Sequence, residues 1–420
     1  MPTLRQKIEQ EIRERGPIPF SRYMELCLYD SELGYYSRNA QQFGKAGDFY
    51  TSSDVHAVFG RLLARQFEEM WRVLGSPEKL KLVELGSGRG LFAQDVLDWS
   101  EKKFPGFFRA VHYVLDERSP ALRQRIEMNL SRHLNAGKAR IDSSLFPVEA
   151  DSRIDLSLAA ERRKNAAHGA SRGYSHDANQ APEGRKNLPP VESADAETPV
   201  IIFANEFFDA LPVEIVSPEG SLRIDAHHGQ FTEVWVESSP EELEFLDRYS
   251  IHPETGERVE VPLQSQTYMT DVCAFSCGFV LVIDYGYTRE EQLAGRHRGT
   301  LKAIRQHSVS ENPYEAPGEQ DITADVNLTA LTATAEKQNM RTQKLVTQSQ
   351  FLLGIGEANQ FADAFEECRL PQERAKVALQ LKHLVTPAGM GESFHVLVGS
   401  KGIELERVAA FAGLSFARNR

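Results

Sequence analysis

A turn with glycine at three alternate positions constrains this chain more than any other feature. The turn holds Gly86, Gly88 and Gly90. It follows a mostly apolar run, Leu80 to Leu85, which predicts a buried strand, and it leads into an amphipathic segment from Leu91, which predicts a helix. Glycines let a ligand approach the backbone closely, and the helix N-terminus offers free N–H groups and partial positive charge. We therefore predict a ligand-binding turn in an α/β sheet.

The glycine spacing separates the two cofactor classes that use such a turn. A dinucleotide site needs G-x-G-x-x-G, with an acidic ribose ligand about 20 residues further on. Here Leu91 occupies the last glycine position of that pattern. The next acidic strand end is Asp116-Glu117, which lies further away than that pattern requires. The spacing resembles the S-adenosylmethionine site of class I methyltransferases. A nicotinamide cofactor and a plain structural turn are the alternatives.

Composition describes an acidic globular protein. The 420 residues include 48 Lys and Arg against 60 Asp and Glu, a net charge of −12 at pH 7. So acidic a chain is a poor non-specific binder of nucleic acid. Its four cysteines lack zinc-site spacing, so we expect no metal site. Reduced, buried thiols are expected and suit a reducing compartment.

No targeting or membrane signal is evident in the sequence. The segment Met1 to Arg15 is charged and amphipathic and has no apolar signal core. No apolar run of about 18 residues occurs, so no membrane span is predicted. The simplest expectation is a cytoplasmic bacterial enzyme.

The chain divides into three parts by pattern and composition. Residues 1–76 predict a helical cap. Its glycine- and aromatic-rich loop, Gly34 through Ser53, is a candidate active-site lid, with the part around Gly47 to Ser52 closing over the site. An ordinary packed Ω-loop is the alternative. Residues 77–150 and 199–420 predict the sheet-containing domain. Residues 151–198 lose nearly all large apolar side chains, so they predict a disordered insertion.

Alternating strand and helix patterns predict a mostly parallel sheet flanked by helices. We expect two βα units over residues 80–150, a loop-rich stretch from Arg296 to Pro317 and a helix that starts near Asp325. An inserted section of β-hairpins, residues 213–236, is expected before a helix. The remaining expected elements are that helix, Pro240–Ser250, and buried strands at Pro199–Ala204, Gly278–Asp284 and, at the far end of the sheet, Phe394–Val398.

Acidic residues occupy two strand ends beside the glycine turn. Glu84 precedes the turn and can orient it or approach the amino-acid end of the cofactor. Glu117 follows the next strand, where a carboxylate can accept two hydrogen bonds from ribose hydroxyls. Asp116 is adjacent, and strand alternation lets only one of the two point inward. Glu117 is the predicted ribose ligand, with Asp116 as the alternative.

A polar stretch follows the next central strand. Asn205 and Glu206 come directly after the strand and Asp209 lies three residues on, at the carboxyl end of the sheet. Methyl transfer from a sulfonium needs alignment and charge matching more than strong acid–base help. Glu206 and Asp209 can clamp a planar guanidinium, and Asn205 can accept one N–H or contact the cofactor. A helix cap is the alternative for Asp209.

Two later segments supply further candidates. Asp284 to Tyr287 ends another buried strand and can shape the acceptor pocket, or simply form a strand-ending turn. His307 lies in the loop-rich stretch and can act as a general base or a hydrogen-bonding pocket residue. A structural histidine is the alternative.

Taken together, eight segments resemble the MidA (DUF185) family. This family includes the arginine-methylating assembly factor of mitochondrial respiratory complex I. The matching segments occur in family order over nearly the whole chain: Gly16–Phe20, Leu33–Tyr36, Gly47–Ser52, Val83–Gly90, Asn205–Pro212, Ile283–Gly286, Gly318–Thr323 and Met390–Gly391.

The resemblance implies a class I methyltransferase fold, Rossmann-like, with a helical N-terminal addition. It also implies that S-adenosylmethionine is the cofactor, and that the activity is symmetric dimethylation of an arginine on a protein such as a respiratory complex I subunit. The residues and the resemblance together assign Glu84, Gly86, Gly88, Gly90, Glu117 and Asn205 to the cofactor, and Asn205, Glu206, Asp209 and His307 to the acceptor. The alternative is a non-catalytic assembly factor that keeps the cofactor pocket and acts by binding a partner.

Overall fold

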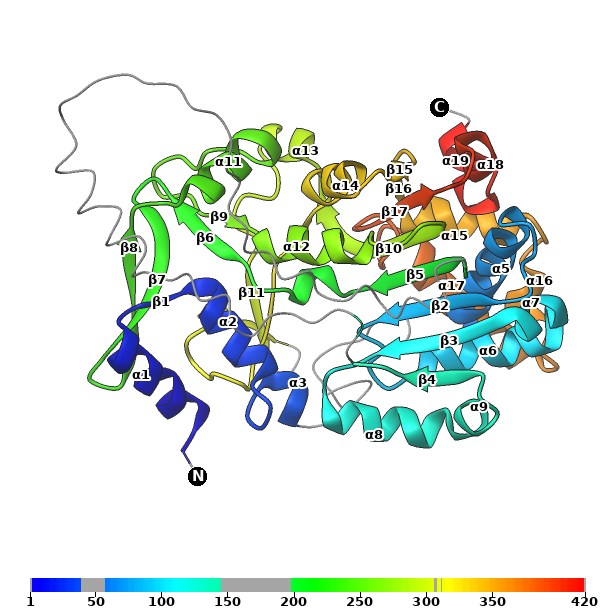
Figure 1. The fold of residues 1–420 in the computed structure, drawn as a ribbon, viewed down its shortest axis with the longest axis horizontal. Coiled ribbons are helices and arrows are strands. Elements are labelled where there is room, and N and C mark those ends of the chain that lie inside the picture. The colour runs from blue at the N-terminus through cyan, green and yellow to red at the C-terminus, as the bar shows by residue number, and fades with distance from the viewer. Residues whose placement is uncertain are drawn as a thin grey trace, which may run out of the picture.

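The structure is a computed structural model, and it describes residues 2–38, 57–143, 145, 198–305, 308–310 and 312–418. One large sheet has helices on both faces, and smaller sheets pack beside it with the N-terminal helices (Figure 1). The Gly47–Ser53 part of the predicted lid, almost all of the 151–198 insertion and His307 lie outside the described residues.

The large sheet is mostly parallel. Its order in the described chain is β15-β17-β10-β5-β2-β3-β4, with β14 beside β10 and β16 beside β17. The parallel strands are β2 (Leu80–Leu85), β3 (Val111–Asp116), β4 (Ala139–Ile141), β5 (Val200–Asn205), β10 (Gly278–Tyr287) and β14 (Val326–Asn327). The antiparallel strands are β17 (Phe394–Lys401), β15 (Arg341–Thr342) and β16 (Val346–Thr347).

Both faces of the large sheet are buried, which explains its continuous apolar runs. In β2, Leu82 packs into one hydrophobic cluster and Val83 into the other, because successive side chains point to opposite faces. Helices α5, α6 and α15 cover the first face, and α12 and α14 cover the second. The helices that supply these layers are α5 (Ala57–Val73), α6 (Leu91–Lys103), α7 (Pro105–Ala110), α8 (Pro120–Asn129), α9 (Ser131–Asn135), α12 (Leu263–Val272), α14 (Leu328–Lys337), α15 (Gln348–Glu357), α16 (Ala362–Phe365), α17 (Pro371–Val385), α18 (Leu405–Ala409) and α19 (Ser415–Arg418).

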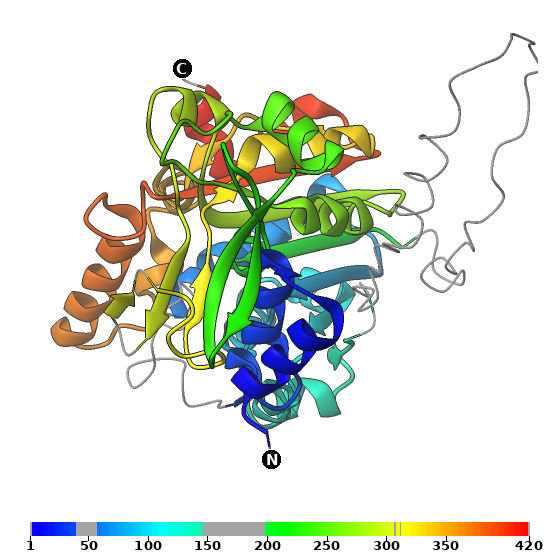
Figure 2. The ribbon, with the colours of Figure 1, turned by 90° about the vertical axis from the view of Figure 1, so that its left-hand side faces the viewer.

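A second layer joins the N-terminal helices to the inserted hairpins. Leu4 and Ile8 share a hydrophobic cluster with Leu222 and Ile322. In Figure 2 the dark blue N-terminal helices lie against the green hairpin strands. The elements of this layer are α1 (Leu4–Arg15), β1 (Ile18–Pro19), α2 (Phe20–Tyr29), α3 (Tyr35–Arg38), β6 (Glu214–Ser217), β7 (Gly220–His227), β8 (Gln230–Val236), α11 (Pro240–Tyr249), β9 (Val259–Val261), α13 (Arg289–Leu293), β11 (Lys302–Arg305), β12 (Ser308–Ser310) and β13 (Asp321–Thr323).

Most sequence-predicted elements are confirmed, and three details are wrong. Residues 80–150 contain a third strand, β4, besides the two βα units. The stretch from Arg296 to Pro317 includes β11 and β12, which pair with each other and through β11 with the distant β13. Such short strands depend on non-local pairing and leave little periodicity in the sequence. The late strand β17 lies inside the sheet edge, because β15 pairs with its outer side.

None of the helices in the described ranges is long and apolar enough to cross a lipid bilayer.

Candidate active site

A cavity of about 420 Å³ lies at the carboxyl ends of β2, β3 and β5. Ligands of open α/β sheets bind at this edge. Carboxylates outnumber cationic side chains along its described walls. The lining carboxylates are Glu25, Glu84, Asp116, Glu117, Glu206, Asp209 and Asp321, against Arg89 and Arg118.

The glycine turn forms one wall of this cavity. Gly86, Gly88 and Gly90 have φ values of 62°, 55° and 73°, in the left-handed region that favours glycine. A Cβ on Gly86 would come within 2.9 Å of the Phe207 ring, whereas one on Gly88 would meet nothing described within 4 Å. Gly88 therefore faces open space, where a ligand can approach the backbone.

Gly90 occupies a different environment from the other two glycines. It is the N-cap of α6 and does not line the cavity. A Cβ there would lie 2.6 Å from the Leu130 side chain. Gly90 therefore allows close packing of the turn against Leu130.

Glu84 lies at the base of the turn and lines the cavity. The Tyr113 hydroxyl donates to Glu84 Oε2 at 2.8 Å. Burial raises the pKa of Glu84 to about 8, and the Tyr113 hydrogen bond opposes that rise. The surroundings of the Glu84 carboxyl therefore bring its titration close to neutral pH.

Glu117 and Asp116 both line the cavity, so the expectation that only one faces inward is wrong. Glu117 lies beyond the last residue of β3, where strand alternation no longer applies. Its Oε2 accepts from the Gly88 N–H at 2.9 Å and its Oε1 from the Ser119 N–H at 2.8 Å. Burial raises the pKa of Glu117 to about 7, and these bonds oppose the rise. The carboxylate thereby ties the glycine turn to the end of β3.

A tyrosine of helix α12 holds the carboxylate of Asp116. Its Oδ2 accepts from the Tyr268 hydroxyl at 3.0 Å. Its Oδ1 is buried and has no hydrogen-bond partner among the described residues. A buried acceptor without a partner is costly, so this oxygen is available to a donor on a ligand.

The turn after β5 forms the opposite wall, and its backbone is strained. Asn205 Nδ2 donates to Glu206 Oε1 at 3.0 Å, and Asn205 Oδ1 is buried without a partner in the described structure. Glu206 has φ 49°, a conformation that non-glycine residues rarely adopt. Such strain persists where surrounding contacts impose it.

Asp284 supplies those contacts from behind the turn. It is fully buried, and its Oδ2 accepts from the Phe207 and Phe208 N–H groups at 3.1 and 2.9 Å. It does not line the cavity. Asp284 thus positions the turn and does not itself shape the pocket surface.

Asp209 is buried at the end of the same wall. It lies in a short 3₁₀ helix, Phe208–Ala210, and its Oδ2 accepts from the Tyr285 hydroxyl. Its Oδ1 is buried with no partner among the described residues. Burial raises the pKa of Asp209 to about 6, and the Tyr285 hydrogen bond opposes the rise.

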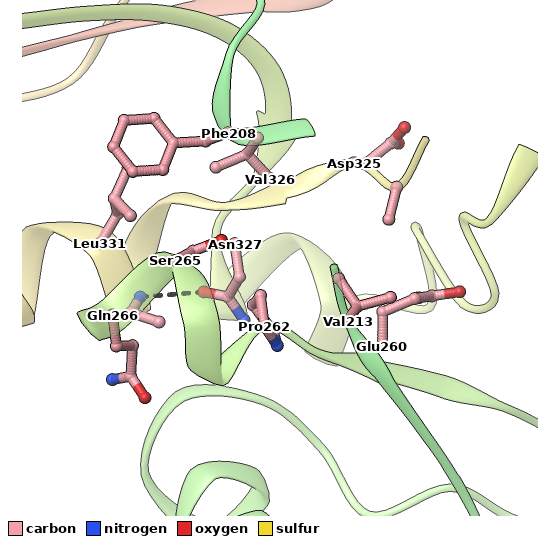
Figure 3. A pocket seen from close by; sticks show the side chains of 12 residues that line it. Phe208, Val213, Glu260, Pro262, Ser265, Gln266, Asp325, Val326, Asn327 and Leu331 are labelled. Carbon is pink, nitrogen blue, oxygen red and sulfur yellow. Dashed lines mark hydrogen bonds between the residues drawn. The ribbon is translucent and has the colours of Figure 1, made fainter. Parts of the chain in front are cut away.

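A second cavity lies behind the turn that follows β5, Asn205 to Phe208, which we call the acceptor turn (Figure 3). Phe208 faces it, whereas Phe207 faces the large cavity. Its volume of about 10 Å³ holds about one water molecule at most. In the wall of this small cavity, the Ala330 N–H donates to Asn327 Oδ1 at 2.9 Å. The larger cavity is therefore the candidate site.

Sequence reasoning assigns no site role to several lining residues, among them Tyr29, Tyr36, Tyr268 and Asp321. Tyr36 and Asp321 fall in segments already singled out by the family resemblance, Leu33–Tyr36 and Gly318–Thr323. Tyr29 and Tyr268 lie on amphipathic helices, where an aromatic side chain looks like ordinary core.

No cluster of three or more potential metal ligands occurs within the described ranges.

The chain is similar to known proteins over almost its whole length. Residues 62–346 match the family model Methyltransf_28, described as S-adenosyl-L-methionine-dependent methyltransferase. The "protein arginine methyltransferase NDUFAF7 homolog, mitochondrial" of Drosophila melanogaster is 27% identical, and the match covers 96% of this chain and 85% of that protein. The human protein named "protein arginine methyltransferase NDUFAF7, mitochondrial" is 25% identical over 92% of this chain and 80% of its own length.

A solved structure shares the fold. A COG1565 superfamily member from Burkholderia thailandensis, crystallised with S-adenosyl-homocysteine, superposes with a TM-score of 0.73. It is 23% identical, and the match covers 98% of this chain and 94% of the other. This likeness extends across both layers of the molecule.

Proposed function

Because the chain belongs to the Methyltransf_28 family of S-adenosyl-L-methionine-dependent methyltransferases, we propose that it methylates arginine side chains of a protein. Family membership confirms the predicted methyltransferase class, cofactor and class I fold. The arginine acceptor is our inference. The relatives named above as protein arginine methyltransferases support it, and the charge of the cavity supports it independently.

The residues at the glycine turn fit the cofactor. Gly88 leaves open space beside the backbone, and the buried acceptors Asp116 Oδ1 and Asn205 Oδ1 have no partner in the described structure. We assign Gly86, Gly88 and Glu84 to the amino-acid end of the cofactor.

Glu117 is our proposed ribose ligand. Each of its carboxylate oxygens already accepts one backbone N–H and retains a second lone pair for a ribose hydroxyl. Asp116, whose Oδ1 has no partner in the described structure, is placed to accept from another donor on the same ligand. Gly90 supports the turn by packing.

The acceptor side carries the proposal. Asn205, Glu206 and Asp209 line the same cavity as the glycine turn, so a donor and an acceptor can meet there. A guanidinium is planar and cationic and is recognised by carboxylates. Bound positive charge would favour the ionised form of Asp209, whose pKa burial raises to about 6.

The bound cofactor supplies a methyl group on a sulfonium. Glu206 and Asp209 orient one acceptor nitrogen, and Asn205 Oδ1 accepts a further N–H. A guanidinium that gains a methyl group must lose one proton, and the carboxylates of Glu206 and Asp209 can receive it. His307 lies outside the described residues and is proposed only as a further base.

The remaining predictions from the sequence extend the proposal. The family resemblance suggests symmetric dimethylation and a respiratory-chain subunit as acceptor. The free cysteines fit a cytoplasmic location. We also propose the predicted division into an N-terminal cap, 1–76, a methyltransferase part, 77–150 and 199–420, and an insertion, 151–198. Within the cap range, helix α5 packs on the large sheet and so belongs structurally with the methyltransferase part.

The test is a labelled-methyl transfer. The full chain is incubated with methyl-labelled S-adenosylmethionine and a protein extract from cells that lack it, and labelled proteins are hydrolysed to amino acids. Label should appear in methylated arginine, and the share in the symmetric dimethyl form tests the finer proposal. Label confined to lysine, to another residue or to small molecules would overturn the arginine assignment.

A further inference from the structure

A third wall of the cavity comes from outside the methyltransferase sheet. Tyr29 ends α2, Tyr36 lies in α3, and Asp321 begins β13. All three line the cavity that also contains the glycine turn and the acidic turn after β5. The N-terminal helices and the small three-stranded sheet thus contribute directly to the site.

These three side chains are fixed by hydrogen bonds. The Tyr36 hydroxyl donates to Asp321 Oδ1 at 2.9 Å, and Asp321 is 5% exposed. The Tyr29 hydroxyl donates to the carbonyl of Ala210 at 2.9 Å, next to Asp209. Both hydroxyls are therefore hydrogen-bonded to other groups of the cavity wall, and these bonds hold the Tyr29 and Tyr36 rings in place.

The rings of Tyr29 and Tyr36 lie together. Their centroids are 5.5 Å apart and their planes tilted by 36°. Burial raises the pKa of Tyr29, and the negative charges of Asp209 and then Asp321 raise it further. Burial likewise raises the pKa of Tyr36, followed by the effects of Asp321, Tyr29 and Asp209. Both carboxylates are thus close enough to act on both phenols.

A guanidinium is suited to this arrangement. It stacks on aromatic faces and pairs with carboxylates in its plane, whereas an ammonium is a compact, strongly hydrated charge. The N-terminal helices also touch the cofactor side, because the Ser119 hydroxyl donates to the Tyr36 carbonyl at 2.7 Å. This third wall therefore reaches from the residues beside the glycine turn to the acceptor turn.

We propose that Asp321, oriented by Tyr36, is a specificity-determining carboxylate for the cationic acceptor, with Tyr29 and Tyr36 as its aromatic wall. This inference rests on the proposed function and assigns its acceptor subsite. A structural role alone, in which the Tyr36–Asp321 bond only anchors α3, would leave acceptor recognition independent of the Asp321 charge.

The test uses two conjugates of adenosine with the full chain. One carries a guanidine on a short linker at the 5′ carbon, and the other carries a neutral urea of the same shape. Calorimetry gives the affinity of each, and their ratio isolates recognition of the charged group. The wild-type chain should prefer the guanidine by tenfold or more, since hydrogen bonds to charged groups are stronger than those between neutral groups.

Asp321→Asn keeps an oxygen that can accept from Tyr36 and removes the charge. It should lower the guanidine-to-urea ratio about tenfold while leaving the affinity for S-adenosylhomocysteine within about twofold. Asp363→Asn is the control, because Asp363 is also a buried, hydrogen-bonded carboxylate but does not line the cavity. It should leave the ratio unchanged.

Tyr36→Phe keeps the ring and removes the hydroxyl that orients Asp321. It should lower the ratio about threefold, and it provides a second measurement if Asp321→Asn fails to fold. An unchanged ratio in the variants that fold, with a wild-type chain that prefers the guanidine, would overturn this inference and leave the arginine proposal standing. A wild-type chain with no preference for the guanidine would instead overturn the arginine proposal.

Discussion

The cofactor wall and the acceptor wall of the cavity are built in different ways. The cofactor wall comes from two adjacent strands, β2 and β3, and the turns that follow them, and its key contacts involve backbone groups such as the Gly88 N–H. The acceptor wall gathers Tyr36, Glu206 and Asp321 from distant parts of the chain, and it acts through side-chain charge. A common cofactor can be held by a local, backbone-based turn, whereas an acceptor subsite can be changed by single side chains.

If this contrast is correct, changes on each wall have separate consequences. Changes at the cofactor wall should alter the affinity for S-adenosylhomocysteine. Changes at the acceptor wall should alter methyl transfer and guanidine preference and leave that affinity nearly intact. The following predictions test the separation, from the largest effect to the smallest.

Gly88→Val should abolish cofactor binding. The added side chain would point into the open space beside the turn, at a φ of 55°. We expect the affinity for S-adenosylhomocysteine to fall at least about 100-fold, as measured by calorimetry.

Gly137→Val is the matched control for Gly88→Val. Gly137 has φ 67°, and a Cβ there also meets nothing described within 4 Å, but it lies away from the cavity. The control carries similar backbone strain, of about 1–2 kcal/mol, and should bind normally. Normal binding by Gly88→Val would remove the glycine turn from the site.

Glu206→Gln should slow methyl transfer by about 50-fold and change the affinity for S-adenosylhomocysteine by less than about twofold. The glutamine keeps an oxygen for the Asn205 Nδ2 donor, so the strained turn is preserved while the charge is lost. The turnover number and the calorimetric affinity are measured on the same preparation. Parallel losses of both quantities would contradict an acceptor role.

Acid should slow methyl transfer through Asp209. The pKa of this carboxyl is raised by burial to about 6 in the ligand-free chain, so kcat/KM should fall about tenfold per pH unit below about pH 6 as the carboxylate is protonated. Asp209→Asn should be slow at every pH and lack this limb of the profile of kcat/KM against pH. A wild-type kcat/KM that is flat down to pH 5 would show that Asp209 does not need to be ionised.

Protonation of Asp209 should also change the stability of the fold. Acid slows methyl transfer, but it should stabilise the ligand-free chain. A buried carboxyl with a raised pKa binds its proton more tightly in the folded state than in the unfolded state. The free energy of unfolding of the ligand-free chain should therefore fall as the pH rises from about 4 to about 6. Denaturant unfolding at the two pH values, for wild type and Asp209→Asn, measures this contribution.

Tyr113→Phe should have the smallest effect, and on the cofactor side. Loss of the hydroxyl removes the hydrogen bond that Tyr113 donates to Glu84 Oε2, so the pKa of Glu84 should rise further. We expect about 1 kcal/mol less stability and about a threefold loss of affinity for S-adenosylhomocysteine at pH 7. The guanidine-to-urea ratio should not change. A change in that ratio would show that the two walls are coupled.

The same contrast explains how far sequence reasoning reaches. The β2 strand, its glycine turn and the acidic end of β3 are close in sequence, so periodicity and spacing predict them. The strand β10 and the turn at Asn205 were also predicted, because buried strands leave long apolar runs. Residues that meet only through tertiary packing left weaker signals.

Tyr29 illustrates the limit. It ends a helix whose other tyrosine, Tyr23, is ordinary buried core, and no local pattern distinguishes the two. Asp284 illustrates a different limit, because the sequence leaves open whether this carboxylate shapes the pocket or belongs to a strand-ending turn, and the structure places it within β10. It turns back to hold the Phe207 and Phe208 N–H groups. The direction of a side chain at a strand end depends on backbone donors that only the fold brings near.

The most direct test of the whole account is a crystal structure of the full chain with the adenosine–guanidine conjugate. The account predicts the adenosine with its ribose on Glu117, and the guanidinium beside Asp209 and Glu206 with Asp321 and the two tyrosines around it. An adenosine bound elsewhere, or a guanidinium that points to solvent while the adenosine is in place, would contradict the claim that one cavity joins the two walls.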